Sequence, residues 1–106
     1  MNEIITALKH FRDERDWKQF QNAKDLSLAL SIEASELLEL FLWKSAEEAD
    51  IDRVKEELAD VFAYAFLLAD AYELDIKDIV FDKMQKNRLK YPVDKAKGTA
   101  KKYTEL

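Results

Sequence analysis

The chain has 106 residues, is 48% apolar and carries a net charge of −5. It has no cysteine and a single histidine, His10, which excludes disulfides, thiolate chemistry and multi-histidine metal sites. The acidic balance argues against general nucleic-acid binding, and no apolar run is long enough to span a bilayer. Because Met1 does not open a signal peptide, we expect a cytoplasmic protein that acts neither on nucleic acid nor in a membrane.

The chain is expected to be all-α. It contains only one Gly and one Pro, and so little turn chemistry favours a few long helices joined by short connections. We predict a single domain over residues 1–106, an antiparallel bundle of about four helices completed by oligomerisation. The predicted helices run from Glu3 to Asp16, from Ala23 to Lys44, from after Ser45 to Tyr72 with a break near Asp50, and from Ile76 to Lys90.

Capping signals support these boundaries. Asn22 and Asp75 precede the second and fourth helices, and Ser45 followed by Glu48 forms a capping-box pattern. Pro92 is expected to stop the last helix. Residues 93–106 have no clear period and are predicted to be an irregular tail with a turn at Gly98.

Two pairs of carboxylates occupy positions where a helix should be apolar. Glu33 and Glu36, and likewise Glu57 and Asp60, are spaced i,i+3 and therefore lie on one face of their helix. On a helical wheel, both pairs fall among leucines, valines and alanines. Since consecutive helices with a short connection pack antiparallel, the four carboxylates are expected to converge. A solvent-exposed charged stripe is the competing explanation.

Converging carboxylates require compensation. Desolvating each ionised carboxylate costs on the order of several kcal/mol, against a typical total stability of roughly 5–15 kcal/mol. No Lys or Arg is predicted to point at this face, so a cation is the expected partner. Oxygen ligands alone favour Mg²⁺, with Mn²⁺ as a substitute and Ca²⁺ less favoured. The lack of Glu–His pairs argues against a di-iron oxygenase.

A basic segment suggests what such a metal would act on. Residues 83–102 hold eight basic side chains and one acidic one, a charge of +7 that leaves −12 for the rest of the chain. A hard-metal site beside a basic segment favours hydrolysis of a polyphosphate, because metals bridge phosphate oxygens and lower the pKa of bound water. A solvated basic tail is the alternative.

The motifs EASELLELFLWKSAEE, EELADVFAY, KMQKNRLKYPV and GTAKKYTEL, together with an N-terminal ERDWKQF, resemble the MazG-type all-α nucleoside triphosphate pyrophosphohydrolases. Within that family they resemble the compact branch that includes dCTP pyrophosphatases. The signature ExxE, a spacer and ExxD is present as Glu33–Glu36 and Glu57–Asp60, and the resemblance extends over nearly the whole chain. It implies that water and a nucleoside triphosphate, preferably a deoxynucleotide, give the monophosphate and pyrophosphate in nucleotide-pool cleansing.

The resemblance also implies roles for individual residues. The four carboxylates would bind Mg²⁺, and we expect Glu36 to act as the general base because it lies at the edge of the apolar stripe. The residues implied in substrate binding are aromatic positions near the base and sugar and a segment near the phosphates: Trp17, Trp43, Tyr64, Lys83, Asn87, Arg88 and Tyr91. Each also has a structural explanation, as a packed aromatic, a solvated charge or a helix cap.

Oligomerisation is expected from the second helix. Leu28, Leu38 and Leu42 lie opposite Glu33, so that this helix is apolar almost all round. A chain this short cannot cover such a helix alone, and we predict a homodimer or a homotetramer. A non-catalytic helical oligomer, acting as a nucleotide-binding regulator or an interaction module, is the alternative to an enzyme.

Overall fold

The computed structural model describes residues 2–106, and these contain helices but no strand. The predicted all-α class is confirmed. The chain divides into two compact units, Met1–Leu74 and Asp75–Leu106. None of the helices in residues 2–106 combines the length and the apolar character that a bilayer span requires.

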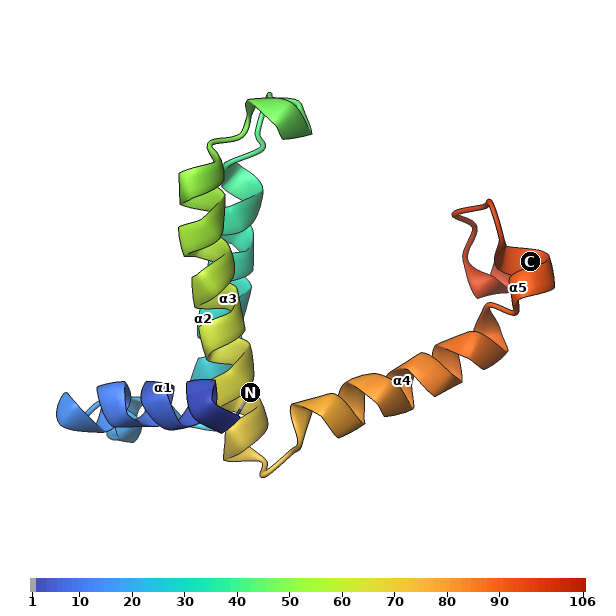
Figure 1. Cartoon of the computed structure of the whole chain (residues 1–106). Helices are drawn as coiled ribbons and strands as arrows, with labels where there is room; N and C mark the ends of the chain where they lie inside the picture. The colour runs from blue at the N-terminus through green and yellow to red at the C-terminus, as the bar shows by residue number, and fades with distance from the viewer. Residues whose placement is uncertain (1) are drawn as a thin grey trace. The chain divides into compact units, whose positions relative to one another are not determined.

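The first unit consists of a long helical hairpin and one helix packed across it (Figure 1). Helices α2 (Ala23–Glu39) and α3 (Ile51–Ala71) run antiparallel and form the hairpin, and α1 (Asn2–Glu14) packs against α3. A short 3₁₀ turn, Lys18–Phe20, follows α1, and a second, Ala46–Glu48, lies at the tip of the hairpin. The hairpin places the two ExxE/ExxD segments side by side.

The predicted caps are present. Asn22 Oδ1 accepts a hydrogen bond from Asp25 N–H at 2.9 Å, and Ser45 N–H donates to Glu48 Oε1 at 3.3 Å. The break expected near Asp50 is real, because Asp50 begins a new helix by accepting from Asp52 N–H at 3.0 Å. Side-chain acceptors thus start both arms of the hairpin. The start of α2 is where the sequence predicts it, whereas α3 starts at the predicted break and not directly after Ser45.

The prediction that the second helix reaches Lys44 is wrong, since α2 ends at Glu39. The following N–H groups of Leu40, Phe41 and Leu42 bond three residues back rather than four, at 3.0–3.3 Å. These bonds tighten the backbone, and Trp43 then adopts a positive φ of 60°. The helix stops early because the chain has to reverse within the few residues before α3.

The core of this unit is small. Only Leu26, Leu40, Leu67 and Ala69 are buried apolar residues among those described, and Leu26 is the most buried at 2% exposure. On the far side of α2, Leu28, Ile32 and Leu38 are exposed. The hairpin therefore keeps apolar surface that its own unit does not cover.

The second unit is built on α4 (Ile76–Lys90), which begins and ends as predicted. Asp75 Oδ1 accepts from Asp78 N–H at 3.0 Å. The tail expected to be irregular contains two short turns, α5 (Val93–Ala96) and the 3₁₀ turn Tyr103–Glu105, joined through Gly98 at a φ of 79°. Tyr103 packs edge-on against Tyr91 at 6.0 Å and under the Lys90 ammonium at 4.8 Å, which folds the tail back onto the end of α4.

Candidate functional site

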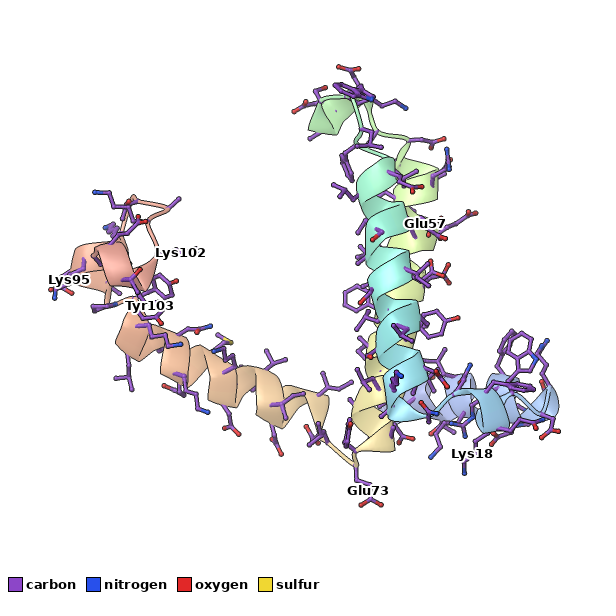
Figure 2. All side chains as sticks on the ribbon, turned by 180° about the vertical axis from the view of Figure 1, so that it is seen from behind. Lys18, Glu57, Glu73, Lys95, Lys102 and Tyr103 are labelled. Carbon is purple, nitrogen blue, oxygen red and sulfur yellow. The ribbon has the colours of Figure 1, made fainter. Side chains whose placement is uncertain are left out.

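Three of the four predicted carboxylates converge between the arms of the hairpin. Glu33 and Glu36 of α2 and Glu57 of α3 each offer an oxygen, and these oxygens lie within 4.8 Å of one another. All three side chains are partly buried. Figure 2 shows Glu57 along the length of the hairpin, away from its tip. We call these three residues the acidic cluster.

The surroundings of the acidic cluster disfavour its full ionisation. Burial, and next the close approach of Glu36, raise the pKa of Glu33 to about 7 from an ordinary value of 4.5. Burial likewise raises the pKa of Glu57, and the charges of Glu36 and Asp60 act in the same direction. No salt bridge in residues 2–106 joins any of these carboxylates to a basic side chain. The cluster thus has negative charge in excess of the protein's own compensation.

Unsatisfied oxygens identify what the cluster lacks. Glu33 Oε2 and Glu57 Oε2 are both buried and have no hydrogen-bond partner in the described part of the chain. Buried acceptors are normally paired, and a cation satisfies such oxygens and neutralises the repulsion at once. Oxygen ligands held at this spacing fit a hard divalent cation. The acidic cluster can therefore hold a metal ion.

Asp60 lies next to the acidic cluster but is not one of the three converging groups. It is exposed, and its charge contributes to the raised pKa values of Glu33 and Glu57. One turn further along α3, burial and then the charges of Glu33 and Asp60 raise the pKa of Tyr64. The phenol consequently remains a neutral hydrogen-bond donor beside the carboxylates.

An aromatic cavity opens beside the acidic cluster. It has a volume of about 270 Å³, and Asp60, Tyr64 and Trp17 lie in its wall. Trp17 packs edge-to-face against Phe11, with ring centroids 5.9 Å apart, which fixes the indole at the start of the Lys18–Phe20 turn. A second hollow of about 250 Å³ shares Trp17 and Tyr64 with the cavity. Flat apolar rings beside a carboxylate suit a planar heterocycle attached to a charged group.

Trp43 does not line the aromatic cavity of its own chain. Its side chain is fully exposed, at 100%, and it lies at the hairpin tip on a backbone of positive φ. It lines none of the cavities described here. A substrate role for Trp43 remains a prediction.

The remaining predicted substrate residues belong to the second unit. Lys83, Asn87 and Tyr91 follow one another at four-residue intervals and so share a face of α4 and its C-terminal end, with Arg88 adjacent. All four are exposed. The Asn87 carbonyl accepts Tyr91 N–H at 2.8 Å, which is an ordinary helix-end bond. Their role toward phosphates also remains a prediction.

Sequence reasoning missed two polar residues of the aromatic cavity, Arg12 and Gln21. Arg12 is buried, and its Nε donates to Asp13 Oδ1 at 2.9 Å. Gln21 Oε1 is buried and finds no hydrogen-bond partner among residues 2–106. Neither belongs to a periodic pattern or a motif: Arg12 follows the apolar stripe of α1, and Gln21 lies in the connection before α2. The only available signal was their nearness in sequence to Trp17.

Comparisons with known proteins show the family of the chain. The chain is 42% identical to dCTP pyrophosphatase 1 of Mus musculus and 40% identical to that of Homo sapiens, each alignment covering 100% of this chain and 67% of the relative. The fold is similar to the crystal structure of a pyrophosphatase from Archaeoglobus fulgidus, with a TM-score of 0.81 and 39% identity over 87% of this chain and 92% of the other. Residues 28–106 match the MazG-like family. The chain therefore belongs to the MazG-like family, as its motifs indicate.

Proposed function

We propose that this chain hydrolyses deoxynucleoside triphosphates to the monophosphate and pyrophosphate with the help of Mg²⁺, for which Mn²⁺ can substitute. Membership of the MazG-like family and the dCTP pyrophosphatases among its relatives make it a nucleoside triphosphate pyrophosphohydrolase. The observation that carries the metal-dependent mechanism is the acidic cluster, with its two buried oxygens that have no partner. Cleansing of the nucleotide pool in the cytoplasm is the corresponding role.

Glu33, Glu36 and Glu57 would hold the metal, with Asp60 completing the set from the edge of the aromatic cavity. A bound divalent cation would neutralise phosphate charge and make an adjacent water more acidic. The preference for Mg²⁺ rests on the donor set, which consists of carboxylate oxygens without nitrogen or sulfur. Two helices facing each other in one hairpin hold these oxygens in place before substrate arrives.

The chain's own residues account for the other requirements of the reaction. Glu36 accepts the proton of the attacking water, and the linkage between the α- and β-phosphoryl groups breaks as the new P–O bond forms. The products are the monophosphate and pyrophosphate. Trp17 and Tyr64 hold the base and sugar in the aromatic cavity of the first unit. In the second unit, the exposed side chains of Lys83, Asn87, Arg88 and Tyr91 are suited to donate to phosphates.

We further propose that the working form is a homodimer or a homotetramer. The exposed leucines on the far side of α2 need a cover, and Ser27, Ser31 and Ser35 on that side satisfy their hydroxyls on the helix's own carbonyls at 2.7–3.0 Å. The polar groups of this face therefore need no water. A second copy would also provide a place for the fully exposed Trp43 ring beside a neighbouring aromatic cavity.

The test is turnover of a panel of dNTPs and NTPs with Mg²⁺, with both the monophosphate and pyrophosphate measured. Glu57→Gln is expected to lower kcat/KM by about 100-fold or more, because it removes one metal oxygen and its charge. Glu56→Gln, an exposed neighbour on the same helix, is the matched control and should retain activity. Nucleotide binding without formation of products would instead support the alternative function, a non-catalytic nucleotide-binding regulator.

A further inference from the structure

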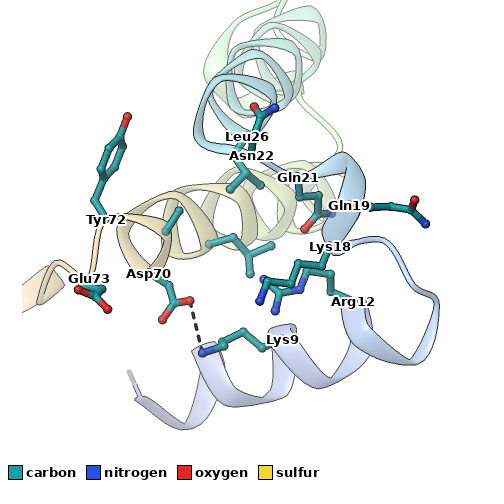
Figure 3. Close-up of a pocket in the computed structure, with 12 residues that line it drawn as sticks. Lys9, Arg12, Lys18, Gln19, Gln21, Asn22, Leu26, Asp70, Tyr72 and Glu73 are labelled. Carbon is teal, nitrogen blue, oxygen red and sulfur yellow. Dashed lines mark ion pairs between the residues drawn. The ribbon is translucent and has the colours of Figure 1, made fainter.

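The first unit has a further cavity besides the aromatic cavity. It has a volume of about 510 Å³ and lies between α1, the Lys18–Phe20 turn and the ends of α2 and α3 (Figure 3). We call it the charged cavity, because three basic and two acidic side chains line it: Lys9, Arg12, Lys18, Asp70 and Glu73. The acidic cluster contributes nothing to its wall.

The charges are segregated within the charged cavity. In Figure 3, Asp70 and Glu73 lie together at the end of α3, whereas Arg12 and Lys18 lie on the opposite side. The Lys9 ammonium lies 3.5 Å from the Asp70 carboxylate, and this ion pair partly neutralises its charge. Lys18 makes no salt bridge with any of residues 2–106. One side of the cavity is thus cationic and the other is acidic.

Several polar groups in this wall are uncommitted. Arg12 is buried and donates its Nε–H to Asp13, whose pKa it holds below the usual value, while no hydrogen bond within residues 2–106 engages its two terminal nitrogens. Gln21 also lines the cavity, and its buried Oε1 has no donor. A buried amide oxygen without a partner costs stability until a donor reaches it. The cavity can therefore accept an anion at one side and hydrogen-bond donors elsewhere.

We propose that the charged cavity binds a nucleoside monophosphate, at a second site distinct from the acidic cluster. Its phosphate would lie between Arg12 and Lys18, and sugar hydroxyls or an exocyclic amine would donate to Gln21 Oε1 and Asp70. The volume suits a ligand of this size, whereas inorganic phosphate alone would fill a small part of it. A triphosphate carries too much negative charge for this wall, because Lys18 is its one cation without a salt bridge in residues 2–106, Arg12 is already paired with Asp13, and the other side is acidic.

The choice of ligand rests on the proposed function, because a nucleoside monophosphate is the product of that reaction. Arg12 and Gln21 line the aromatic cavity as well as the charged cavity. Occupation of the charged cavity would orient both side chains and so alter the aromatic cavity on the other side of them. Accumulated product bound at the second site would then regulate turnover through Arg12 and Gln21, which line both cavities.

The experiment is calorimetric titration of the full chain with dCMP, while a non-hydrolysable α,β-methylene dNTP and Mg²⁺ occupy the catalytic site. We expect one dCMP to bind per chain, with inorganic phosphate and deoxycytidine each binding more weakly. Lys18→Met should weaken dCMP binding about tenfold, because it removes one charge-assisted contact. The matched control is Lys24→Met, an exposed lysine of α2 outside the cavity wall.

The proposal is overturned by three results: no dCMP uptake by the blocked protein, equal affinity in Lys18→Met and the wild type, or phosphate binding as tightly as dCMP. Lys18 is exposed and supports no packing, so its substitution does not threaten the fold. Absence of turnover with the dNTP panel would refute the proposed function and leave this titration interpretable. Absence of Lys18-dependent binding would refute the second site and leave turnover intact.

Discussion

At the scale of single residues, the acidic cluster shows how burial prepares a site for a cation. Two carboxylates on facing helices have raised pKa values, and each carries a buried oxygen without a partner. Protonation of a carboxylate and binding of a divalent cation both reduce the repulsion between these carboxylates, because each removes negative charge. The stability of the protein should therefore depend on pH and metal together.

The raised pKa of Glu33 determines whether stability rises or falls with pH. Its pKa is about 7 in the folded protein and 4.5 ordinarily, so the folded state binds the proton more tightly. The resulting stabilisation is complete below about pH 4.5 and is lost as the pH rises through about 7. In metal-free buffer, the melting temperature of Glu33→Gln relative to wild type should consequently rise between pH 5 and pH 8.

The control for this prediction is Glu39→Gln, an exposed carboxylate on the same helix, whose difference from wild type should not follow pH in this range. Saturating Mg²⁺ should raise the melting temperature of the wild type by ligand binding and should raise that of Glu33→Gln less. A Glu33→Gln variant that is less stable than wild type at pH 8 without metal would contradict the argument.

Trp43 combines two unfavourable features, a fully exposed indole and a backbone φ of 60°. Glycine adopts that φ without steric cost, so Trp43→Gly should leave the stability of the chain unchanged or raise it by up to about 1 kcal/mol. We expect the same variant to raise the KM for dNTPs, because the aromatic surface for the base would be smaller. Equal KM values together with unchanged stability would leave Trp43 without a role in substrate binding.

At the scale of elements, the sequence predicts where helices start more accurately than where they end. Asn22 and Asp75 are recognisable because a short side-chain acceptor satisfies N–H groups that every helix leaves free. The end of α2 at Glu39 carries no such signal, since the apolar pattern continues to Trp43. Reversal of the chain into α3 decides that boundary, and reversal is a tertiary constraint.

The cap at Asn22 can be tested directly. Asn22→Ala removes the acceptor for Asp25 N–H and should lower the free energy of unfolding by about 1 kcal/mol. Asn22→Asp retains an acceptor at the same place and should remain close to wild type. Urea denaturation of both variants measures the difference, and equal losses in the two would show that the cap is not what Asn22 contributes.

At the scale of the whole molecule, the sequence predicted the acidic cluster better than the cavities. Two i,i+3 pairs on consecutive helices suffice to predict converging carboxylates, although Asp60 lies beside the converging group and not within it. The charged cavity has no such pattern. Lys9 and Lys18 belong to α1 and to the turn after it, and only the path of residues 15–22 brings them to the same wall. Irregular connections of this kind have no periodicity to reveal where they lead.

The apolar far face of α2 is expected to be an interface between copies of the chain. Leu38 is 64% exposed there, in line with further exposed leucines, and a second copy of the chain would bury this surface. Leu38→Glu introduces a charge that would have to be desolvated at the interface, so we expect it to reduce the particle mass measured by light scattering at micromolar concentration. Lys55→Glu, a charge change at an exposed position of α3, should leave the mass unchanged. A wild-type protein that is already monomeric at that concentration would contradict the prediction, and the exposed leucines would then need a partner other than this chain.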